Sequence, residues 1–583
     1  TYGWAQAGLT RIETTAGVSA LGGRVGLFIQ QLLTSVDDGS IDWGSYDNDG
    51  PDGVPNSGDD DGFVDVLAIL HPGFGAECGG AGLEDRVWSH KWSLTDAWFS
   101  IPEDERPSEG VFTTQSTSAS GGPIRIDDYT IQPLLSCDAS SINEIGVLAH
   151  ELGHGFGLPD LYCTTSGCAS NGIGRWGLMG SGGWGCGSHD PARPCHLSAW
   201  SKAVLGWVEV ETLLPDVDHG ALSLEPVQSS GRVLRIDARD GSDEYFLLEN
   251  RQALGFDEGV FAPGLLVWQI DPDFIAERWP FNSVNGRGDH LGVWLRQADG
   301  RLDLEGGVNR ADAGDPFPGS TGTTAFHAGA APASFTHDGG AAGVTLTEVA
   351  DAGGGLVSFR SISGYRSVSV DVQGSGAPGL VLVDDEPLPA GGATYLRAPF
   401  QGVVLAAEAG ESLGVGVRKP FLEWADDPGA SRIRVLVTPR DEDAAVTAVY
   451  GSEEVQITAE VEGGILDVVP GAVVTTPGSP DLWVPLGEPI SLRADPAPGF
   501  AFVDWTGQWR GRGNPFDLTP LAPVTVGAEF GITFLSLARA LALDGTALPP
   551  ALAGALDADG NDNGRYDVGD LRAYLRSGAG GSQ

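Results

Sequence analysis

The sequence predicts a multidomain, mostly β protein: an α/β domain comes first, β-sandwich domains follow, and a small α-helical calcium-loop domain ends the chain. A chain of 583 residues is too long for one hydrophobic core, and usual domain sizes divide it into roughly three to five units. The 87 Gly and 37 Pro favour strands and turns over long helices. All six cysteines lie in the first third of the chain, which sets that part apart from the rest.

The charge balance excludes some partners. Asp and Glu outnumber Lys and Arg by 79 to 33, which gives a net charge of -46. A chain of this sign repels nucleic acid and anionic membranes, so we expect neither as a partner. No apolar run is long enough to span a bilayer. The opening residues, TYGWAQAGLT, lack a signal-peptide pattern, so we expect a mature or trimmed product.

The cysteines indicate an oxidising compartment. Their number is even and none forms a C-x-x-C pair, which favours disulfides over a thiolate metal site. We therefore expect a secreted, extracellular protein. Two pairs are close in sequence, and the connectivity that we expect is Cys163–Cys168, Cys186–Cys195 and Cys78–Cys137.

Residues 1–210 alternate helical and strand patterns, as an α/β domain does. The strongest helix is predicted over residues 141–157, where Ser141 and Glu144 have the spacing of a capping box. Apolar residues recur along it at helical spacing, so we expect it to pack in the domain core. The run FVDVLAIL, residues 63–70, predicts a buried strand.

The rest of the chain predicts further domains. Residues 211–362 contain short strands such as EYFLLENR between Gly/Asp turns, which indicates a β-sandwich. Residues 366–452 and 455–531 share a plan of strands, an aromatic pair and closing strands, so we expect two tandem β-modules. Residues 534–577 combine helical patterns with an Asp/Asn-rich loop.

The helix over residues 141–157 carries the chemistry. His150 and His154 are four residues apart and share a face, so both can bind one zinc ion while Glu151 points to the water that zinc activates. Gly157 can end the helix in a left-handed conformation and return Asp160 as a third ligand. A helix with incidental histidines is the alternative. It is disfavoured because two His and a Glu on an apolar helix are costly to bury without a metal.

These residues match the H-E-x-x-H-x-x-G-x-x-D consensus of metzincin peptidases, and the chain resembles the immune inhibitor A family. The resemblance extends to GRWGLMGSGGWG, residues 174–185, where Met179 stands at the place of the metzincin Met-turn and is the only methionine. It includes WSHKW at residues 88–92 and HLSAWSKAVLGW at residues 196–207, and it reaches to about residue 360. It implies a zinc endopeptidase that acts on proteins or peptides. We expect Glu249 and Asp315 to be structural anchors.

Two acidic loops predict calcium. An acidic loop before a strand also occurs in that family. Clustered carboxylates repel one another unless a cation bridges them, which favours calcium in this loop. The alternative is a solvated polar turn. The residues of this loop are Asp47, Asp49, Asp59, Asp61 and Asp65. The C-terminal loop has the spacing of positions 1, 3, 5, 7, 9 and 12 of a calcium loop, filled by Asp559, Asn561, Asn563, Arg565 through its carbonyl, Asp567 and Asp570.

The C-terminal loop resembles a dockerin repeat. A complete dockerin carries two repeats and one is visible here, so we expect a calcium-stabilised tail rather than a module that binds a cohesin partner. The β-modules resemble the internalin B-repeat group of secreted bacterial proteins. That resemblance implies a bacterial protein whose modules act as spacers or contact surfaces or glycans.

The function predicted is hydrolysis of peptide bonds with Glu151 as general base. A non-catalytic adhesin that works through its β-modules is an alternative. It is disfavoured because Glu151 and all three zinc ligands are present. A different hydrolysis on the same zinc, such as deamidation or ester cleavage, is the other alternative, since a fold does not fix its function.

Overall fold

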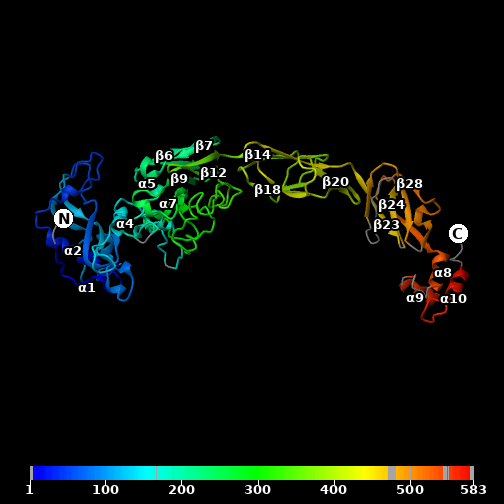
Figure 1. Cartoon of the computed structure of the whole chain (residues 1–583), viewed down its shortest axis with the longest axis horizontal. Helices are drawn as coiled ribbons and strands as arrows, with labels where there is room; N and C mark the ends of the chain where they lie inside the picture. Colours follow the sequence, from blue (N-terminus) through cyan, green and yellow to red (C-terminus); the bar gives the residue numbers. More distant parts are fainter. Residues whose placement is uncertain are drawn as a thin grey trace. The chain divides into compact units, whose positions relative to one another are not determined.

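The computed structural model describes residues 4–20, 22–165, 167–187, 190–461, 463–469, 481–497, 500–542, 548 and 550–577. The chain forms two compact units (Figure 1). Unit 1 comprises residues 1–366 and 397–401, and unit 2 comprises residues 367–396 and 402–583. The predicted multidomain, sheet-rich architecture is confirmed, whereas the finer domain boundaries stay predictions.

The first part of unit 1 surrounds a three-stranded sheet of order β1-β5-β2. Strand β1 runs parallel to β5, and β2 runs antiparallel to it. Side chains from helices α2 and α3 pack on this sheet and form one apolar core with it. The elements are α1 (Arg11–Thr15), α2 (Val25–Val36), β1 (Leu67–Phe74), β2 (His90–Ser93), α3 (Leu94–Ser100), β3 (Phe112–Thr117), β4 (Pro123–Ile126), β5 (Asp128–Leu135), α4 (Ile145–Gly155) and α5 (Ala199–Val204).

Two predicted elements are shifted. Strand β1 starts at Leu67 and not at residue 63, because residues 63–66 still close the acidic loop, where the Asp65 amide donates to the Tyr46 carbonyl. Helix α4 starts at Ile145 rather than at residue 141. The expected capping box is absent because the Ser141 hydroxyl and amide both donate to Asp138.

The orientation of α4 also differs from the expectation. The buried residues of this helix are Gly146, Glu151 and Gly153, whereas Ile145 is 46% exposed. The apolar face therefore does not lie in the core. The glycines of the helix face neighbouring segments of the same chain. This packing brings the polar residues of the motif into the interior.

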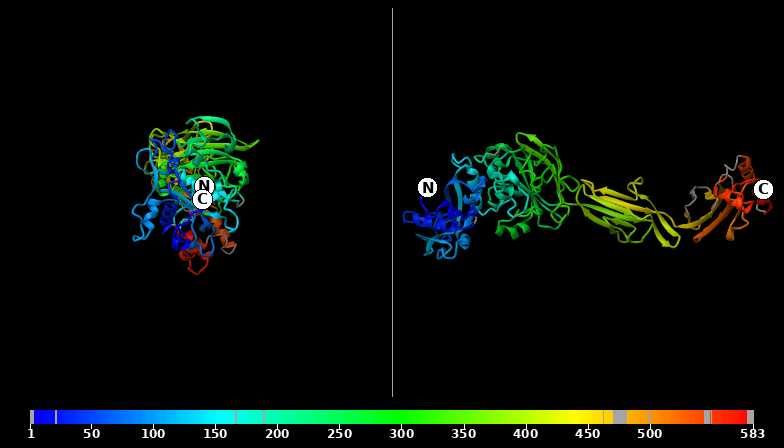
Figure 2. Two further views of the ribbon diagram at one scale, coloured as in Figure 1. Left: turned by 90° about the vertical axis from the view of Figure 1, so that its left-hand side faces the viewer. Right: turned by 90° about the horizontal axis from the view of Figure 1, so that it is seen from below.

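A β-sandwich forms the second part of unit 1. Its five-stranded sheet has the order β11-β10-β9-β8-β6 and its three-stranded sheet the order β12-β13-β7; the green strands in Figures 1 and 2 show these layers. Phe246 of β9 and Phe359 of β13 belong to the apolar core between the sheets. The elements are β6 (Glu209–Thr212), β7 (Asp218–Leu224), α6 (Val227–Ser230), β8 (Arg232–Asp237), β9 (Tyr245–Arg251), β10 (Gly264–Ile270), α7 (Pro272–Arg278), β11 (Val293–Leu295), β12 (Val344–Gly353) and β13 (Leu356–Ser363).

The other face of the five-stranded sheet packs against the first part of unit 1. Leu266 and Trp268 of β10 share an apolar core with Trp176, Met179 and Trp200. The segment that follows the motif of His150 and His154 therefore packs against the sandwich.

The described strands of unit 2 surround two apolar cores, one built from residues 368–450 and one from residues 455–530. A nine-stranded sheet runs through both, and sheets of four and three strands face it. Trp424 and Trp505 are fully buried in the two cores, and each donates its indole N–H to a backbone carbonyl. The strands are β14 (Arg366–Gln373), β15 (Val381–Val383), β16 (Glu386–Pro387), β17 (Ala393–Arg397), β18 (Gly402–Ala407), β19 (Gly410–Gly414), β20 (Val417–Trp424), β21 (Ile433–Val437), β22 (Ala444–Tyr450), β23 (Glu454–Val461), β24 (Gly464–Val469), β25 (Asp481–Pro485), β26 (Ile490–Pro496), β27 (Phe500–Trp505), β28 (Phe516–Leu518) and β29 (Val524–Ile532).

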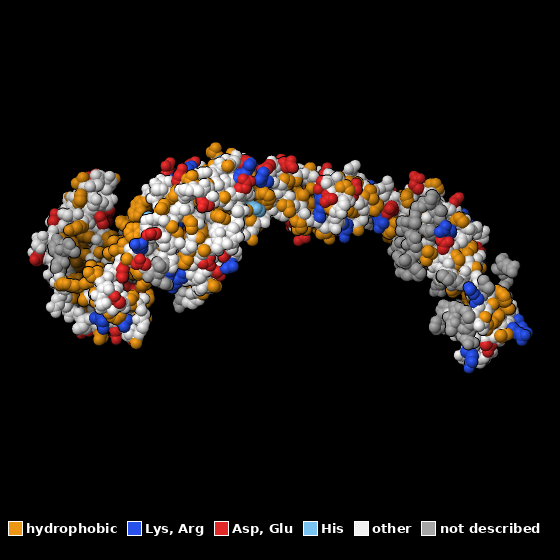
Figure 3. Space-filling model, in the orientation of Figure 1, with side chains coloured by type: hydrophobic (Ala, Val, Ile, Leu, Met, Phe, Trp, Pro, Cys, Tyr) orange, Lys and Arg blue, Asp and Glu red, His pale blue; other side chains and the backbone are white. Residues whose placement is uncertain are grey.

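Three helices end unit 2: α8 (Phe534–Ala542), α9 (Pro550–Asp559) and α10 (Val568–Arg576). They enclose a small core of Leu537, Leu548, Leu556 and Tyr566. Within the described ranges, none of the helices has the length and apolar character that a bilayer span requires. On the face drawn in Figure 3, acidic, basic and apolar side chains are interspersed.

Candidate active site

Helix α4 presents His150 and His154 on one face, with ring centroids 4.9 Å apart. Nδ1 of His150 lies 2.8 Å from the Leu178 carbonyl oxygen, and Nδ1 of His154 lies 2.7 Å from the Leu158 carbonyl oxygen. A carbonyl oxygen only accepts, so both Nδ1 atoms carry a proton, and in the neutral form of each ring the lone pair lies on Nε2. This is the arrangement in which metal-binding histidines are usually held.

Asp160 meets both histidines. Its Oδ1 lies 3.1 Å from Nε2 of His150 and 3.3 Å from Nε2 of His154. Gly157, at φ +85°, allows the sharp turn that returns the chain to this point. The structure therefore brings the three predicted zinc ligands together, with one atom from each within 4.8 Å of the others.

The charges of this cluster are coupled. Burial acts to raise the pKa of Asp160, but hydrogen bonds from His150 and His154 outweigh it and hold that pKa below its ordinary value. Burial lowers the pKa of His150, but Asp160 and Glu151 outweigh this and raise it to about 9. The three side chains thus form a compact, mutually stabilised donor set of two nitrogens and one oxygen.

Met179 lies against the helix that carries the motif. It is fully buried, and its carbonyl accepts the Leu161 amide at 2.8 Å. A Cβ added to Gly153 would lie 2.4 Å from the Met179 sulfur, so the helix approaches this turn as closely as glycine permits. The turn that contains Met179, which we expected to lie beneath the metal, therefore packs against α4.

Glu151 is 6% exposed and faces two adjoining cavities. Burial raises the pKa of Glu151, while the neighbouring histidines oppose the shift. The cavities have volumes of about 300 and 780 Å³. Both are lined by Trp88, Ser89, His150, Glu151 and Tyr162.

Two residues of the site were not predicted. Asn282 accepts the Asp160 amide at 2.6 Å and donates its Nδ2 to Oδ2 of Asp160 at 2.7 Å. Tyr162 lies over the His150 ring, with centroids 6.2 Å apart. Burial and the Asp160 carboxylate raise the pKa of Tyr162, so it stays protonated. Asn282 is 122 residues from Asp160 in the sequence, so only the fold could reveal this contact. Tyr162 follows Asp160 by two residues, and this position could have indicated that its side chain lies in the site.

The acidic loop before β1 brings together part of the predicted set. Carboxylate oxygens of Asp47, Asp49 and Asp61 lie within 4.8 Å of one another. Asp47 is fully buried, and both its carboxylate oxygens have no hydrogen-bond partner within the described part of the chain. Burial and the nearby carboxylates of Asp60, Asp61, Asp49 and Asp65 raise the pKa of Asp47 to about 6.

The other members of this loop are placed differently. Asp65 accepts the Asn48 amide, whereas Asp59 accepts the Ser57 hydroxyl and the Asp52 amide. Asp60, which was not predicted, is buried and accepts the amides of Gly50 and Ser57.

The C-terminal loop gathers several predicted residues. Asn561 and Asn563 donate to Asp567 at 2.9 and 2.7 Å, and the buried Asp570 accepts the Asn561 amide. The Arg565 amide donates to the Asn563 side chain.

Two aspartates, Asp557 and Asp559, lie at the start of the C-terminal loop. Asp559 ends α9 and is exposed. Asp557, which was not predicted, is buried and accepts the amides of Asn563 and Gly564. Its signal in the sequence was the Asp-x-Asp pair that it forms with Asp559.

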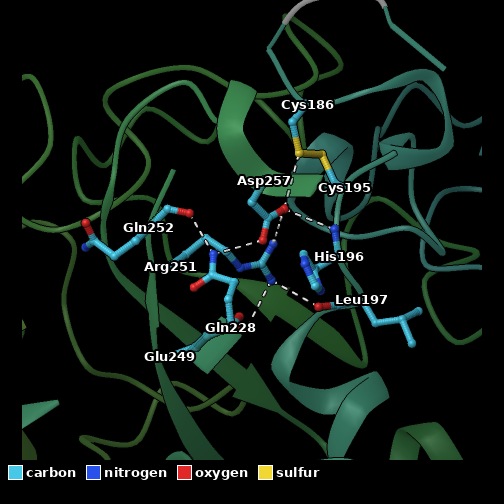
Figure 4. Close-up of a disulfide and its surroundings, with 9 residues drawn as sticks. All are labelled: Cys186, Cys195, His196, Leu197, Gln228, Glu249, Arg251, Gln252 and Asp257. Atoms are coloured by element: carbon cyan, nitrogen blue, oxygen red, sulfur yellow. Dashed lines mark hydrogen bonds and ion pairs between the residues drawn. A yellow bond between two sulfur atoms is a disulfide. The ribbon is translucent and has the colours of Figure 1, made fainter. Parts of the chain in front are cut away.

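Disulfides reinforce the first part of unit 1. The bonds are Cys78–Cys137, Cys163–Cys168 and Cys186–Cys195, which confirms that disulfide bonds are present. Figure 4 shows the third bond beside Asp257, whose Oδ1 lies 3.3 Å from Nη1 of the buried Arg251. Glu249 forms ion pairs with Arg251 at 2.9 Å and with Lys202 of α5 at 2.7 Å.

The two expected anchors lie far from the motif in sequence. Glu249 joins α5 to the sandwich through its pair with Lys202, and it also accepts the Trp268 indole N–H. Asp315 accepts the indole N–H of Trp176 at 2.7 Å. Both carboxylates thus join segments that surround the site. Their partners here are Lys202, Trp268 and Trp176, none of which is a predicted zinc ligand.

Comparison with known proteins gives the class of this region. Residues 30–208 match the family described as immune inhibitor A peptidase M6, catalytic domain. The matched residues include His150, Glu151, His154 and Asp160, so this part of the chain is similar to a metallopeptidase catalytic domain, in agreement with the coarser part of the predicted function.

Individual relatives support the same class. The chain is 33% identical over 160 residues to Immune inhibitor A of Bacillus thuringiensis subsp. alesti, covering 27% of this chain and 21% of that protein. It is 31% identical over 192 residues to the pre-pro-metalloprotease PrtV of Vibrio cholerae serotype O1 (strain M66-2), covering 32% of this chain and 18% of that protein. The chain therefore spans about a fifth of the length of these curated relatives. Among solved structures, the Bacillus anthracis TIE protein matches with a TM-score of 0.13 and 9% identity over 33% of this chain and 41% of that one, which carries no argument about the fold.

Proposed function

We propose that the chain is a secreted zinc endopeptidase of the metzincin type that hydrolyses proteins or peptides, with Glu151 as general base. The observation that carries the proposal is the convergence of two histidine nitrogens and one Asp160 oxygen beside a buried carboxylate at the junction of two cavities. The disulfides support an extracellular location, because such bonds persist in oxidising compartments.

The residues present fit a zinc ion. His150, His154 and Asp160 offer two imidazole nitrogens and one carboxylate oxygen, and catalytic zinc sites use three protein ligands of these kinds and keep one position open. The carbonyls of Leu178 and Leu158 hold the Nδ1 atoms, which leaves the Nε2 lone pairs for the metal. Bound zinc supplies a Lewis acid that polarises the scissile carbonyl and makes a water molecule more acidic.

Glu151 moves the protons of the reaction. Its buried position raises its pKa, which makes it a stronger base than an exposed glutamate. The carboxylate takes a proton from the attacking water and later gives it to the leaving amine. Tyr162, which stays protonated, lies next to His150 and can donate a hydrogen bond to the oxygen on which negative charge develops.

We also propose structural calcium at the two acidic loops. The buried Asp47, whose carboxylate oxygens have no partner in the described residues, supports a cation held with Asp49 and Asp61. At the C-terminus, Asn561, Asn563, Asp567 and Asp570 support a second ion. Equilibrium dialysis with calcium tests both sites: Asp47→Asn and Asp570→Asn should each lose one bound ion, and unchanged stoichiometry would remove the corresponding site.

Cleavage of unfolded casein tests the enzymatic proposal. Zinc in each purified protein is measured by elemental analysis, so that loss of chemistry is separated from loss of metal. We expect Glu151→Gln to keep its zinc and to lower kcat/KM by about 10²- to 10⁴-fold. Glu144→Gln, at the start of the same helix, is the control and should cleave like the wild type. Zinc-loaded wild type that cleaves no faster than Glu151→Gln would overturn the proposal.

A further inference from the structure

We propose that Arg310 of the sandwich selects substrates that carry an acidic side chain next to the cleaved bond. The inference rests on the peptidase function proposed above and names the kind of side chain that the smaller cavity accepts. This cavity has a volume of about 300 Å³, which suits a single amino-acid side chain. Its walls include Glu151 of α4, Ser181 and Trp184 of the turn that follows the motif, and Arg310. We call it the turn pocket.

A loop of the sandwich forms one wall of the turn pocket. The Asn171 side chain donates to the Asn309 carbonyl at 2.6 Å, and the Arg175 amide donates to the Arg310 carbonyl at 2.7 Å. A Cβ on Gly174, which has φ +55°, would lie 2.1 Å from the Arg310 carbonyl oxygen, so this approach requires glycine. The backbone of Arg310 is therefore fixed against the segment that leads to the pocket.

Arg310 gives this wall a positive charge. The residue is exposed, and its side chain makes no hydrogen bond or ion pair with the residues that the structure describes. The guanidinium of the buried Arg175 lies near it, since burial and the charge of Arg310 both lower the pKa of Arg175. A carboxylate beside Arg310 offsets this repulsion and accepts hydrogen bonds from the planar guanidinium.

Glu77 also lines the turn pocket, but its carboxylate is already bonded. Its Oε1 accepts the Ser89 hydroxyl at 2.6 Å, and its Oε2 accepts the Ser89 amide at 3.2 Å. Glu77 follows β1 in the first part of unit 1, whereas Arg310 belongs to the sandwich, so the two charges lie on different walls. A substrate carboxylate therefore finds unused donors at Arg310, and Arg310 sets the charge preference of the pocket.

Cleavage of a peptide library by four zinc-loaded proteins tests the inference. They are the wild type, Arg310→Gln, Arg310→Glu and the control Arg301→Gln, which changes a 64% exposed side chain of the same loop that lines neither cavity. We expect the wild type and the control to enrich Asp and Glu over Asn and Gln at one position next to the cleaved bond. The expected enrichment is about ten- to a hundredfold, as for a hydrogen bond to a charged group. Arg310→Gln should lose it, and Arg310→Glu should favour Lys and Arg there.

The outcomes separate this inference from the proposed function. Cleavage by the wild type without enrichment of Asp and Glu, or enrichment that persists in Arg310→Gln, would overturn the role of Arg310 and leave the peptidase in place. Enrichment of Lys and Arg by the wild type would assign the preference to Glu77 and would also overturn it. If the zinc-loaded wild type cleaves no peptide, the proposed function fails, and this inference fails with it.

Peptide binding supplies a readout that needs no turnover. Two peptides that differ only by Glu or Gln at the enriched position are titrated into Glu151→Gln, and fluorescence anisotropy gives each Kd. We expect the Glu peptide to bind about tenfold more tightly, and Arg310→Gln in the same background should remove the difference. The first comparison uses a single protein, so it decides the inference even if an Arg310 variant does not fold. Equal Kd values for the two peptides would overturn the inference.

Discussion

Asn282 extends the candidate site beyond the sequence motif. It bonds both the backbone and the carboxylate of Asp160, so it fixes the side chain that presents the third ligand oxygen. We expect Asn282→Ala to weaken zinc affinity by about 10- to 100-fold, as loss of such support usually does. Competition with a chelating dye measures this. Ser283→Ala, one residue further on, should bind zinc like the wild type, and an Asn282→Ala protein with unchanged affinity would contradict this role.

Asp315 predicts a pH dependence of stability. Burial raises its pKa to about 7, against an ordinary value of 3.8, although the Trp176 hydrogen bond opposes the shift. Between these values the folded chain binds a proton that the unfolded chain has released, so stability falls as pH rises through this window. From pH 5 to pH 7.5 the wild type should lose on the order of 2 kcal/mol more unfolding free energy than Asp315→Asn. Urea unfolding at the two pH values measures this, and parallel curves for the two proteins would refute it.

The motif residues were predictable because they are local. His150, Glu151 and His154 share one helix, and Gly157 and Asp160 follow within a few residues, so spacing alone defines their geometry. Asn282 and Arg310 reach the site only through the fold of the sandwich. No pattern of period 2 or 3.6 carries that information.

At the scale of elements, helix α4 shows which local rules were overridden. Its start was predicted four residues early because the Ser141 hydroxyl and amide bond to Asp138 instead of capping the helix. Its apolar stripe suggested a core-facing side, yet Glu151 and two glycines are the buried residues. Tertiary contacts with the Met179 turn decide the orientation of this helix.

The close approach of α4 to Met179 predicts a coupled pair. A Cβ on Gly153 would meet the methionine sulfur at 2.4 Å, inside the contact distance of real atoms. We expect Gly153→Ala to lower the free energy of unfolding by about 1–3 kcal/mol through overpacking. Gly153→Ala/Met179→Ala should lose less than the sum of the single changes, because the second change removes the clash. Denaturant unfolding of the four proteins measures the coupling, and strict additivity would show that the contact carries no strain.

At the scale of the whole molecule, unit 1 combines the motif region and the sandwich in one body. Met179 and Trp176 share an apolar core with Leu266 and Trp268 of β10, and Lys202 pairs with the buried Glu249. The multidomain, sheet-rich architecture was predictable from composition and turn residues. The shared core of these two parts was not predictable, because its contacts join segments that are far apart in the chain.

The shared core predicts how unit 1 tolerates division. A fragment of residues 1–210 would expose Met179 and Trp176 and leave Lys202 without Glu249. We therefore expect this fragment to bind zinc weakly and to lack peptidase activity, while a fragment of residues 1–401 retains both. Zinc binding and casein cleavage by the two fragments measure this, and full activity in residues 1–210 would show that the sandwich is dispensable.

Mapping cleavage sites in a peptide library tests whether the chain is a zinc endopeptidase that uses Glu151 as its base. The full chain is incubated with the library with and without a zinc chelator, and Glu151→Gln is treated in parallel. We expect internal cleavage by the zinc-loaded wild type, loss of that cleavage with the chelator, recovery when zinc is restored, and no cleavage by Glu151→Gln. Cleavage that persists in the chelator or in Glu151→Gln, or no cleavage by the zinc-loaded wild type, would contradict it.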